Sequence, residues 1–189
     1  MAIRTFLAID INKAVGKSLR AVDDALAGLE AKIKPVAPAN RHVTVKFLGD
    51  VEDARVNDVC RAAADIAGQV RPFEFQVGPA LTVPPAGRKL KMVWAEVSET
   101  TGRLRQIGDA CEESFEKLGF PRQRRPFRPH ITLARVKFCR DPQPVRQAIE
   151  QLATTVFGRC LASQLTVYSS LLTRSGPVYQ AMARCDLGG

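Results

Sequence analysis

The feature that most constrains this chain is a four-residue pattern that occurs twice and contains both of its histidines. His42-Val43-Thr44-Val45 and His130-Ile131-Thr132-Leu133 each consist of a histidine, an apolar residue, a threonine and a second apolar residue. Alternate side chains of an extended strand point to opposite faces, so each motif places an imidazole and a hydroxyl on one face and two apolar side chains on the other. The pattern therefore predicts two related strands, each buried on one face only.

The polar faces of the two motifs, brought together, predict acid and base chemistry on a phosphodiester. An imidazole has an ordinary pKa near 6.5, so one histidine can be neutral while the other is charged. One of His42 and His130 then takes a proton from water while the other gives a proton to the departing oxygen, and Thr44 and Thr132 can hydrogen-bond the phosphoryl oxygens. The residues alone do not say which histidine has which role. We expect no metal and no other cofactor, because two histidines without a nearby Cys-x-x-Cys are too few ligands for zinc.

The charge of the chain predicts an anionic partner. Lysine and arginine outnumber aspartate and glutamate by 28 to 19, which gives a net charge of +9, and such a balance favours nucleic acid, although it also serves solubility. Arginines gather around the second histidine, at positions 122, 124, 125, 128 and 135. Arg128 has the strand parity of His130 and Arg135 follows the motif, so these two are candidate phosphate ligands. Lys46 has the parity of His42, so it either faces the phosphate or extends into solvent.

Periodicity and turn residues predict the elements of the chain. We expect strands near residues 4–10, 41–48, 73–77, 92–97, 131–138, 161–171 and 177–185, and helices near 12–29, 52–67, 101–118 and 144–152. Loops are expected around Pro35 and Pro38, and around the basic segment 84–91. Strand, helix, motif strand and helix occur twice without a linker. The sequence therefore predicts one α+β domain over residues 1–189, bilobal and pseudo-symmetric, with a mainly antiparallel sheet and outer helices in each lobe and an active-site cleft between the lobes.

The remaining composition predicts a soluble cytoplasmic protein. The five cysteines are odd in number and scattered, as expected for reduced thiols in a core. The N-terminus lacks the organisation of a signal peptide, and no apolar stretch is long enough to span a bilayer. We expect a monomer with no membrane partner. Phe6 and Trp94 are expected in the core, although Phe6 on the first strand could also stack on a base.

Four stretches of the chain resemble one known family. They are residues 4–10 (RTFLAID), 42–49 (HVTVKFLG), 125–135 (RPFRPHITLAR) and 170–179 (SLLTRSGPVY), in the family's order over nearly the whole chain. The chain resembles the 2H phosphoesterases, which are named for two His-x-Thr-x motifs. Within them it is most similar to the RNA 2′,3′-cyclic phosphodiesterase branch, also called the 2′-5′ RNA ligase type.

The resemblance implies a bilobal α+β fold and metal-independent hydrolysis of RNA 2′,3′-cyclic phosphate ends to 2′-phosphates. It also assigns the roles that the residues left open. By similarity, His42 is the proton donor to the leaving 3′ oxygen and His130 is the proton acceptor that activates water. Thr44 and Thr132 hold the phosphate, with Arg135 beside them.

Other functions share these residues and remain open at this stage. The same site can join RNA ends through a 2′-5′ bond by the reverse reaction, or open a small cyclic nucleotide. A noncatalytic RNA-binding module is a third alternative, although phosphate binding alone is served by arginine and lysine without paired histidines. The sequence names neither the physiological RNA nor a base preference.

Overall fold

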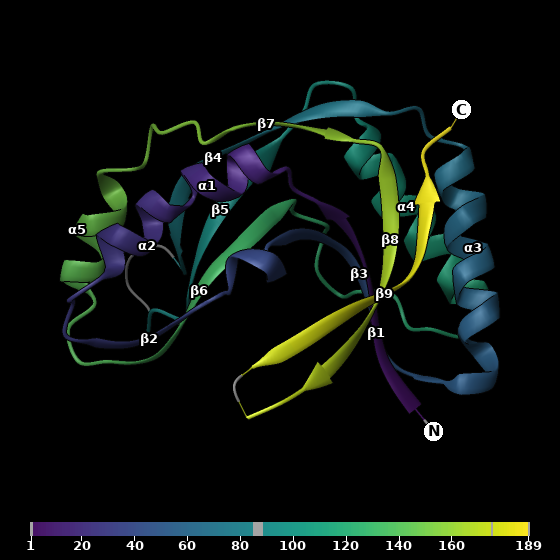
Figure 1. Ribbon diagram of the computed structural model, residues 1–189, viewed down its shortest axis with the longest axis horizontal. Helices are drawn as coiled ribbons and strands as arrows, with labels where there is room; N and C mark the ends of the chain where they lie inside the picture. Colours follow the sequence, from purple (N-terminus) through teal and green to yellow (C-terminus); the bar gives the residue numbers. More distant parts are fainter. Residues whose placement is uncertain (1, 85–88, 175, 189) are drawn as a thin grey trace.

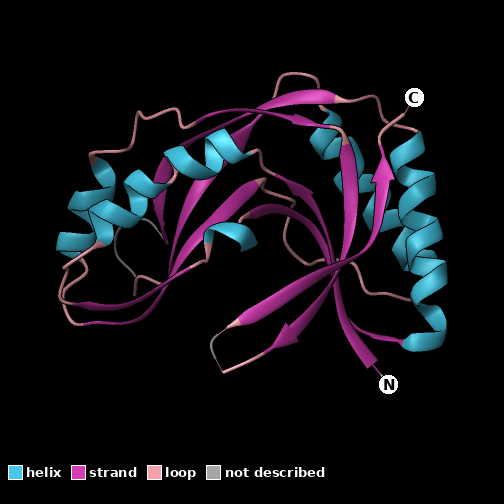
Figure 2. Cartoon of the chain, viewed as in Figure 1, coloured by secondary structure: helices cyan, strands magenta, loops and turns pink. Residues whose placement is uncertain are grey.

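The fold is a curled sheet with helices packed at both ends (Figures 1 and 2). A computed structural model describes residues 2–84, 89–174 and 176–188. The helices are α1 (Lys13–Ser18), α2 (Arg20–Leu26), α3 (Val56–Gly68), α4 (Arg103–Lys117) and α5 (Gln143–Glu150), with short 3₁₀ turns at Pro38–Asn40 and Asp53–Arg55. The strands are β1 (Ala2–Asp10), β2 (Ala31–Pro35), β3 (His42–Glu52), β4 (Phe73–Val83), β5 (Met92–Ser98), β6 (His130–Cys139), β7 (Gly158–Ala162), β8 (Gln164–Leu172) and β9 (Pro177–Asp186).

The strands just named all belong to one antiparallel sheet that consists of two parts. Its order is β7-β4-β5-β6-β3-β1-β8-β9, and β2 pairs with β6. The strands β3 and β6 share one paired position, Val43 opposite Ile131. We call β3, β1, β8 and β9 the His42 half, and β7, β4, β5, β6 and β2 the His130 half. The two motif strands are therefore where the halves meet.

The helices exchange between these halves, because a helix that connects strands of one half packs against the other half. The pair α1 and α2 connects β1 towards β3 in the His42 half, yet it packs against β7 and α5 of the His130 half. In the same way α4 connects β5 to β6 in the His130 half, yet it packs against β3 and α3 of the His42 half. Figure 1 shows α1, α2 and α5 at one end of the molecule and α3 and α4 at the other. Neither half of the sequence therefore forms one half of the fold.

The predicted α+β fold with two related, mainly antiparallel parts is confirmed, and two element predictions are wrong. The expected strand 161–171 is two strands, broken at Ser163, of which β7 pairs with β4 and β8 pairs with β1. The expected loop through Pro35 contains strand β2. The helix expected from residue 12 does begin there, because Asn12 Oδ1 accepts from the Val15 amide at 2.8 Å, but it is divided into α1 and α2. In the basic loop, residues 85–88 lie outside the described part of the chain.

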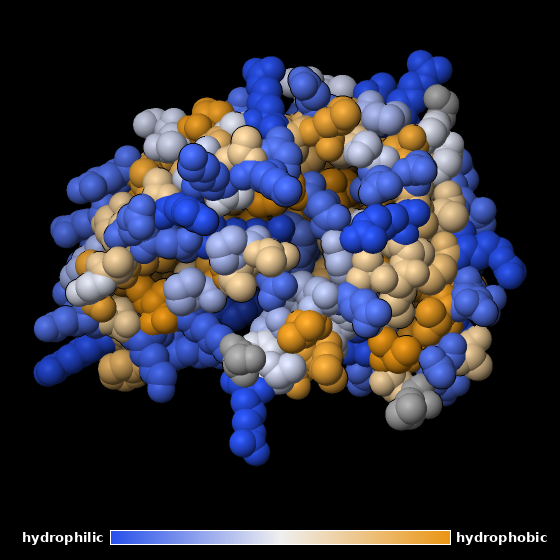
Figure 3. Space-filling view, viewed as in Figure 1, coloured by the Kyte–Doolittle hydropathy of each residue, from blue (hydrophilic) through white to orange (hydrophobic). Residues whose placement is uncertain are grey.

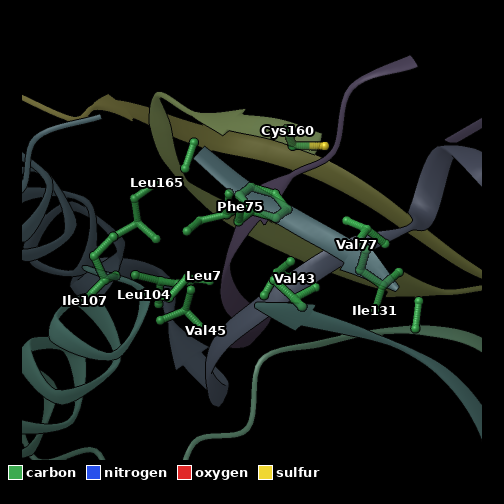
Figure 4. Packing of buried hydrophobic residues seen from close by; sticks show 14 of the residues in the cluster. Leu7, Val43, Val45, Phe75, Val77, Leu104, Ile107, Ile131, Cys160 and Leu165 are labelled. Atoms are coloured by element: carbon green, nitrogen blue, oxygen red, sulfur yellow. The ribbon is translucent and has the colours of Figure 1, made fainter. Parts of the chain in front are cut away.

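A buried apolar core lies behind both motifs. Val43 and Ile131 are fully buried and Val45 is 3% exposed, as the alternation of the motifs predicts. Figure 4 shows these side chains beside Leu7 and Val77, which come from different strands. Hydrophilic side chains surround scattered apolar ones on the face drawn in Figure 3. All five cysteines are free thiols, and none of the helices in the described segments has the length and apolar character that crossing a bilayer requires.

Candidate active site

The pairing of Val43 with Ile131 determines how the two motifs face each other. Because β3 and β6 are antiparallel, continuing this register places His42 beside Thr132 and Thr44 beside His130. The apolar partner of each histidine points into the core, so both imidazoles and both hydroxyls lie on the opposite face of the sheet. The structure therefore brings His42, Thr44, His130 and Thr132 together.

The His42 ring is held on three sides. Its Nε2 lies 3.0 Å from Thr44 Oγ1 in a hydrogen bond, and the ring also hydrogen-bonds to the backbone of Asn40. Phe6 stacks against it with the ring centroids 4.9 Å apart. Burial lowers the pKa of His42 from 6.5 to about 4, against the opposing effects of the Asn40 hydrogen bond and of the Asp10 carboxylate.

The His130 ring has a similar setting with a different aromatic partner. Its Nδ1 lies 2.7 Å from the Arg128 carbonyl, which can only accept, so Nδ1 carries the hydrogen and Nε2 of the neutral ring is a free acceptor. Trp94 stacks on the ring at a centroid distance of 3.7 Å and an interplanar angle of 20°. Burial lowers the pKa of His130, and the Arg128 charge acts in the same direction.

The two imidazoles influence each other electrostatically. Positive charge on His130 contributes to lowering the pKa of His42, which requires the rings to be near each other. In the unliganded protein, the pair of rings therefore binds its first proton more readily than its second. A phosphodiester placed between the rings would raise both pKa values, because its negative charge stabilises each imidazolium.

A β-bulge after each threonine decides which later side chains face the site. In β3, Thr44 pairs with Ala8 but Lys46 pairs with Leu7, so Val45 is the extra residue. In β6, Thr132 pairs with Trp94 and Ala134 with Val93, so Leu133 is the extra residue. Each bulge reverses the alternation that follows it. Phe47 and Arg135, which occupy equivalent positions after the two motifs, are therefore exposed on the site's face.

The prediction that Lys46 lies on the face of His42 is wrong, because the bulge turns its side chain to the opposite face. Its side chain is completely buried on the core side, where Nζ donates to Glu112 Oε2 at 2.7 Å and to the Pro121 carbonyl at 3.2 Å. Lys46 therefore neither faces a phosphate nor extends into solvent. Strict alternation from His42 gave the wrong face because it took no account of the extra residue.

The predicted arginines have different surroundings. Arg135 is exposed, and its charge acts on the phenol of Tyr179 in the His42 half. Arg128 pairs with Glu96 on β5 while its backbone carbonyl anchors His130. Arg122 pairs with Glu116 at 2.7 Å, and Arg124 and Arg125 are exposed, as expected for a solvated loop.

Several residues around His42 were missed by sequence reasoning. Asp10 lies opposite His42 on β1 and accepts from the Tyr168 hydroxyl at 2.7 Å. Tyr168 stacks on Phe6 at 5.3 Å, and Tyr179 contacts both Phe6 and His42 at 4.9 and 5.5 Å. Phe6 is 2% exposed, so its placement in the core is confirmed, although it also supports His42. The sequence contains one indication of their importance, because Tyr168 and Tyr179 are the only two tyrosines of the chain.

The candidate site consists of general acid and base groups with hydroxyl and guanidinium donors nearby. Within the described ranges, no three or more histidine, cysteine, aspartate or glutamate side chains gather in a way that could hold a metal ion. The chemistry that the arrangement offers directly is proton transfer beside a bound anion.

Comparison with known proteins gives a consistent match along the chain. The model of the LigT-like phosphoesterase family matches twice, over residues 9–94 and 95–179, so each match contains one histidine motif. The RNA 2′,3′-cyclic phosphodiesterase of Methanothermobacter thermautotrophicus is 31% identical over 182 residues, which cover 96% of this chain and 97% of that protein. The protein of the same name from Aquifex aeolicus is 28% identical over 185 residues, covering 97% and 95%.

Solved structures share the fold. A protein of Thermus thermophilus superimposes with a TM-score of 0.83 at 25% identity, covering 98% of each chain. Apo LigT of E. coli superimposes with a TM-score of 0.73 at 24% identity, covering 100% of this chain and 99% of LigT. The similarity to the 2H phosphoesterases expected from the motifs is thereby confirmed. With both halves matched by one family model, the chain belongs to the LigT-like phosphoesterases.

Proposed function

We propose that this protein hydrolyses RNA 2′,3′-cyclic phosphate ends to 2′-phosphates. The observation that carries the proposal is the pairing of Val43 with Ile131, which places an imidazole and a hydroxyl from each motif around one space. The relatives named RNA 2′,3′-cyclic phosphodiesterase support the choice of substrate, because they align with nearly the whole chain.

His130 is the proposed proton acceptor. Its Nδ1 hydrogen is held by the Arg128 carbonyl, so Nε2 can take a proton from a water molecule as the water oxygen attacks phosphorus. The ring becomes an imidazolium during this step, and the face of the Trp94 indole stabilises that charge.

His42 is the proposed proton donor. As the bond between phosphorus and O3′ breaks, the His42 proton passes to O3′, while the bond to O2′ is kept and the product is a 2′-phosphate with a free 3′-hydroxyl. Burial lowers the pKa of His42 to about 4, so at neutral pH the ring is charged only when the substrate's negative charge is beside it. Substrate binding and proton uptake are therefore coupled in this proposal.

Thr44, Thr132 and Arg135 are the proposed phosphate ligands. Thr44 lies within hydrogen-bond distance of His42. Thr132 also lies beside His42, in the continued register of β3 and β6. Their hydroxyls can hydrogen-bond the nonbridging oxygens as negative charge develops there. Arg135 adds a charged donor from the exposed side of β6.

The proposal treats residues 1–189 as one catalytic domain that acts as a monomer in the cytoplasm without a metal. The exchange of helices between the halves supports a single domain. Both histidines and both threonines of the site come from one copy of the chain, so the proposed chemistry needs no second copy. Free cysteines are consistent with a reducing compartment.

The decisive experiment uses an RNA oligonucleotide that ends in a 2′,3′-cyclic phosphate, with excess chelator present. We expect a 2′-phosphate product from the parent protein and a rate roughly 10²–10⁴ lower in His42→Ala and in His130→Ala. Arg105→Gln, at an exposed position on α4, is the control and should retain the parent rate. Full activity in both histidine variants would refute the mechanism.

The same assay separates the alternatives. Joined products that contain a 2′-5′ bond would identify end joining, and turnover of small cyclic nucleotides alone would identify a different substrate. RNA binding without turnover, retained when both histidines are replaced, would identify a noncatalytic binding module. Loss of activity on adding chelator would contradict the metal-independent mechanism.

A further inference from the structure

An exposed phenylalanine next to the histidines is not used by the chemistry. The bulge in β3 turns Phe47 towards the site's face, where it is 55% exposed. Its ring lies 5.7 Å from Phe6, which in turn stacks on His42 at 4.9 Å. Phe47 is therefore one aromatic ring removed from the proposed proton donor. An exposed aromatic ring beside a phosphate site offers a face on which a base can stack.

Two arginines flank the same aromatic group. The charges of both Arg4 and Arg135 act on the phenol of Tyr179, which packs edge-on against Phe6 at 4.9 Å. Arg4 lies on β1 two residues before Phe6, on the same face of that strand, whereas Arg135 comes from the His130 half. Asp50 is the cross-strand partner of Arg4, but among the described residues no carboxylate lies within the 4.0 Å of an ion pair with it. The face therefore combines stacking surface with positive charge.

We propose that Phe47, Tyr179 and Arg4 bind the nucleotide that precedes the cyclic phosphate end of an RNA substrate. The proposal rests on the proposed function and adds a second nucleotide position to it. The base of that nucleotide stacks on Phe47, and the phosphate that links it to the terminal nucleoside lies by Arg4 and the Tyr179 hydroxyl. An aromatic face accepts any base, so this site selects for strand length and not for sequence.

The position of the group favours RNA over other occupants. A strand that ends in a cyclic phosphate between His42 and His130 continues away from the histidines. The buried Phe6 contacts both His42 and Phe47, so the exposed Phe47 ring lies next to the site and is available to the continuing strand. The neighbouring charges are guanidinium groups, which complement a phosphodiester backbone.

The test compares a 2′,3′-cyclic mononucleotide with di- and trinucleotides that end in the same cyclic nucleotide. We expect kcat/KM of the parent protein to be roughly 5- to 150-fold higher for the dinucleotide, the range found for one stacked base. Phe47→Ala and Phe47→Leu should lose most of this advantage through KM. Arg4→Gln should also reduce it and should lower the salt dependence of dinucleotide binding by a slope of about 1. Phe47→Tyr should retain it.

Matched controls lie elsewhere on the surface. Phe138→Ala removes a phenylalanine that is 61% exposed near the far end of β6, and Arg105→Gln removes an exposed arginine on α4. Both should keep the ratio of dinucleotide to mononucleotide kcat/KM. Thermal unfolding of each Phe47 variant shows whether the fold is intact, and Phe47→Leu keeps most of the apolar volume if Phe47→Ala does not fold.

The outcomes separate this proposal from the proposed function. A parent protein that hydrolyses mononucleotide and dinucleotide equally well would overturn the second nucleotide site and leave the hydrolytic function standing. A Phe47 variant that loses activity on both substrates in the same proportion would also overturn it, because Phe47 would then serve only His42. A parent protein that hydrolyses neither substrate would overturn the proposed function itself.

Discussion

Each histidine of the site lies between an aromatic ring and the backbone two residues before it. His42 has Phe6 and Asn40, and His130 has Trp94 and Arg128. The two aromatic partners have unequal effects on charge, since the indole of Trp94 stabilises a neighbouring cation better than the phenyl ring of Phe6 does. Among the described residues, none accepts a hydrogen bond from the buried Trp94 Nε1, which costs roughly 1–3 kcal/mol. The pseudo-symmetric motifs therefore have unequal environments for positive charge.

The lowered pKa values predict the pH dependence of the reaction. Burial lowers the pKa of His42 to about 4 and lowers that of His130 below 6.5. The active free enzyme carries one proton on the pair, so raising the pH above these values removes the proton of the acid, and lowering it further protonates the base. We expect kcat/KM for a cyclic phosphate to peak below pH 6.5 and to fall about tenfold per pH unit above the peak. An optimum above pH 7.5 would contradict these environments.

At the scale of single elements, the two bulges mark the limit of sequence reasoning. Alternation correctly placed His42 and Thr44 on one face, because strand geometry fixes those positions. Beyond Thr44 and Thr132 it failed, since a bulge depends on how a strand pairs with its neighbour and leaves no periodic signal. Alternation for this reason predicts the wrong face for Lys46 and does not indicate that Phe47 faces the site.

The buried pair of Lys46 and Glu112 predicts unequal effects of removing either partner. Lys46 is fully buried, whereas the Glu112 side chain is 19% exposed and also accepts from the Gln123 amide at 3.0 Å. Glu112→Ala leaves an ammonium group without its counter-ion in the core, so we expect a loss of about 3 kcal/mol in the free energy of unfolding. Lys46→Met should cost clearly less, because water still reaches Glu112. Urea unfolding of both variants and of the double variant measures the difference, and equal losses would contradict it.

Some strand and helix boundaries can be predicted from local sequence, whereas others cannot. Helix α3 and strand β5 have regular periodicity and were expected nearly where they lie. The break at Ser163 was not, because β7 and β8 are distinguished only by the different strands with which they pair. The side of the sheet that each helix covers is likewise a property of long-range packing. Local sequence therefore specified most elements but not the exchange between halves.

For the whole molecule, this exchange predicts that the two halves unfold together. Trp94 is the only tryptophan and lies in the His130 half, whereas Val59 is fully buried on α3 in the His42 half. We expect Val59→Ala to lower the urea midpoint seen by Trp94 fluorescence by the same amount as the midpoint seen by far-UV circular dichroism. Separate transitions for the two probes would show that the halves are independent.

The order of the strands also determines when the site forms during protein synthesis. Both histidines have been made once β6 is complete, yet β1 then still lacks its neighbour β8. Tyr168 and Tyr179, which contact Phe6 and His42, belong to β8 and β9, which follow β6 in the chain. A nascent chain therefore carries both motifs without the finished surroundings of His42. The site is therefore complete only after β8 and β9 have been made and have paired with the rest of the sheet.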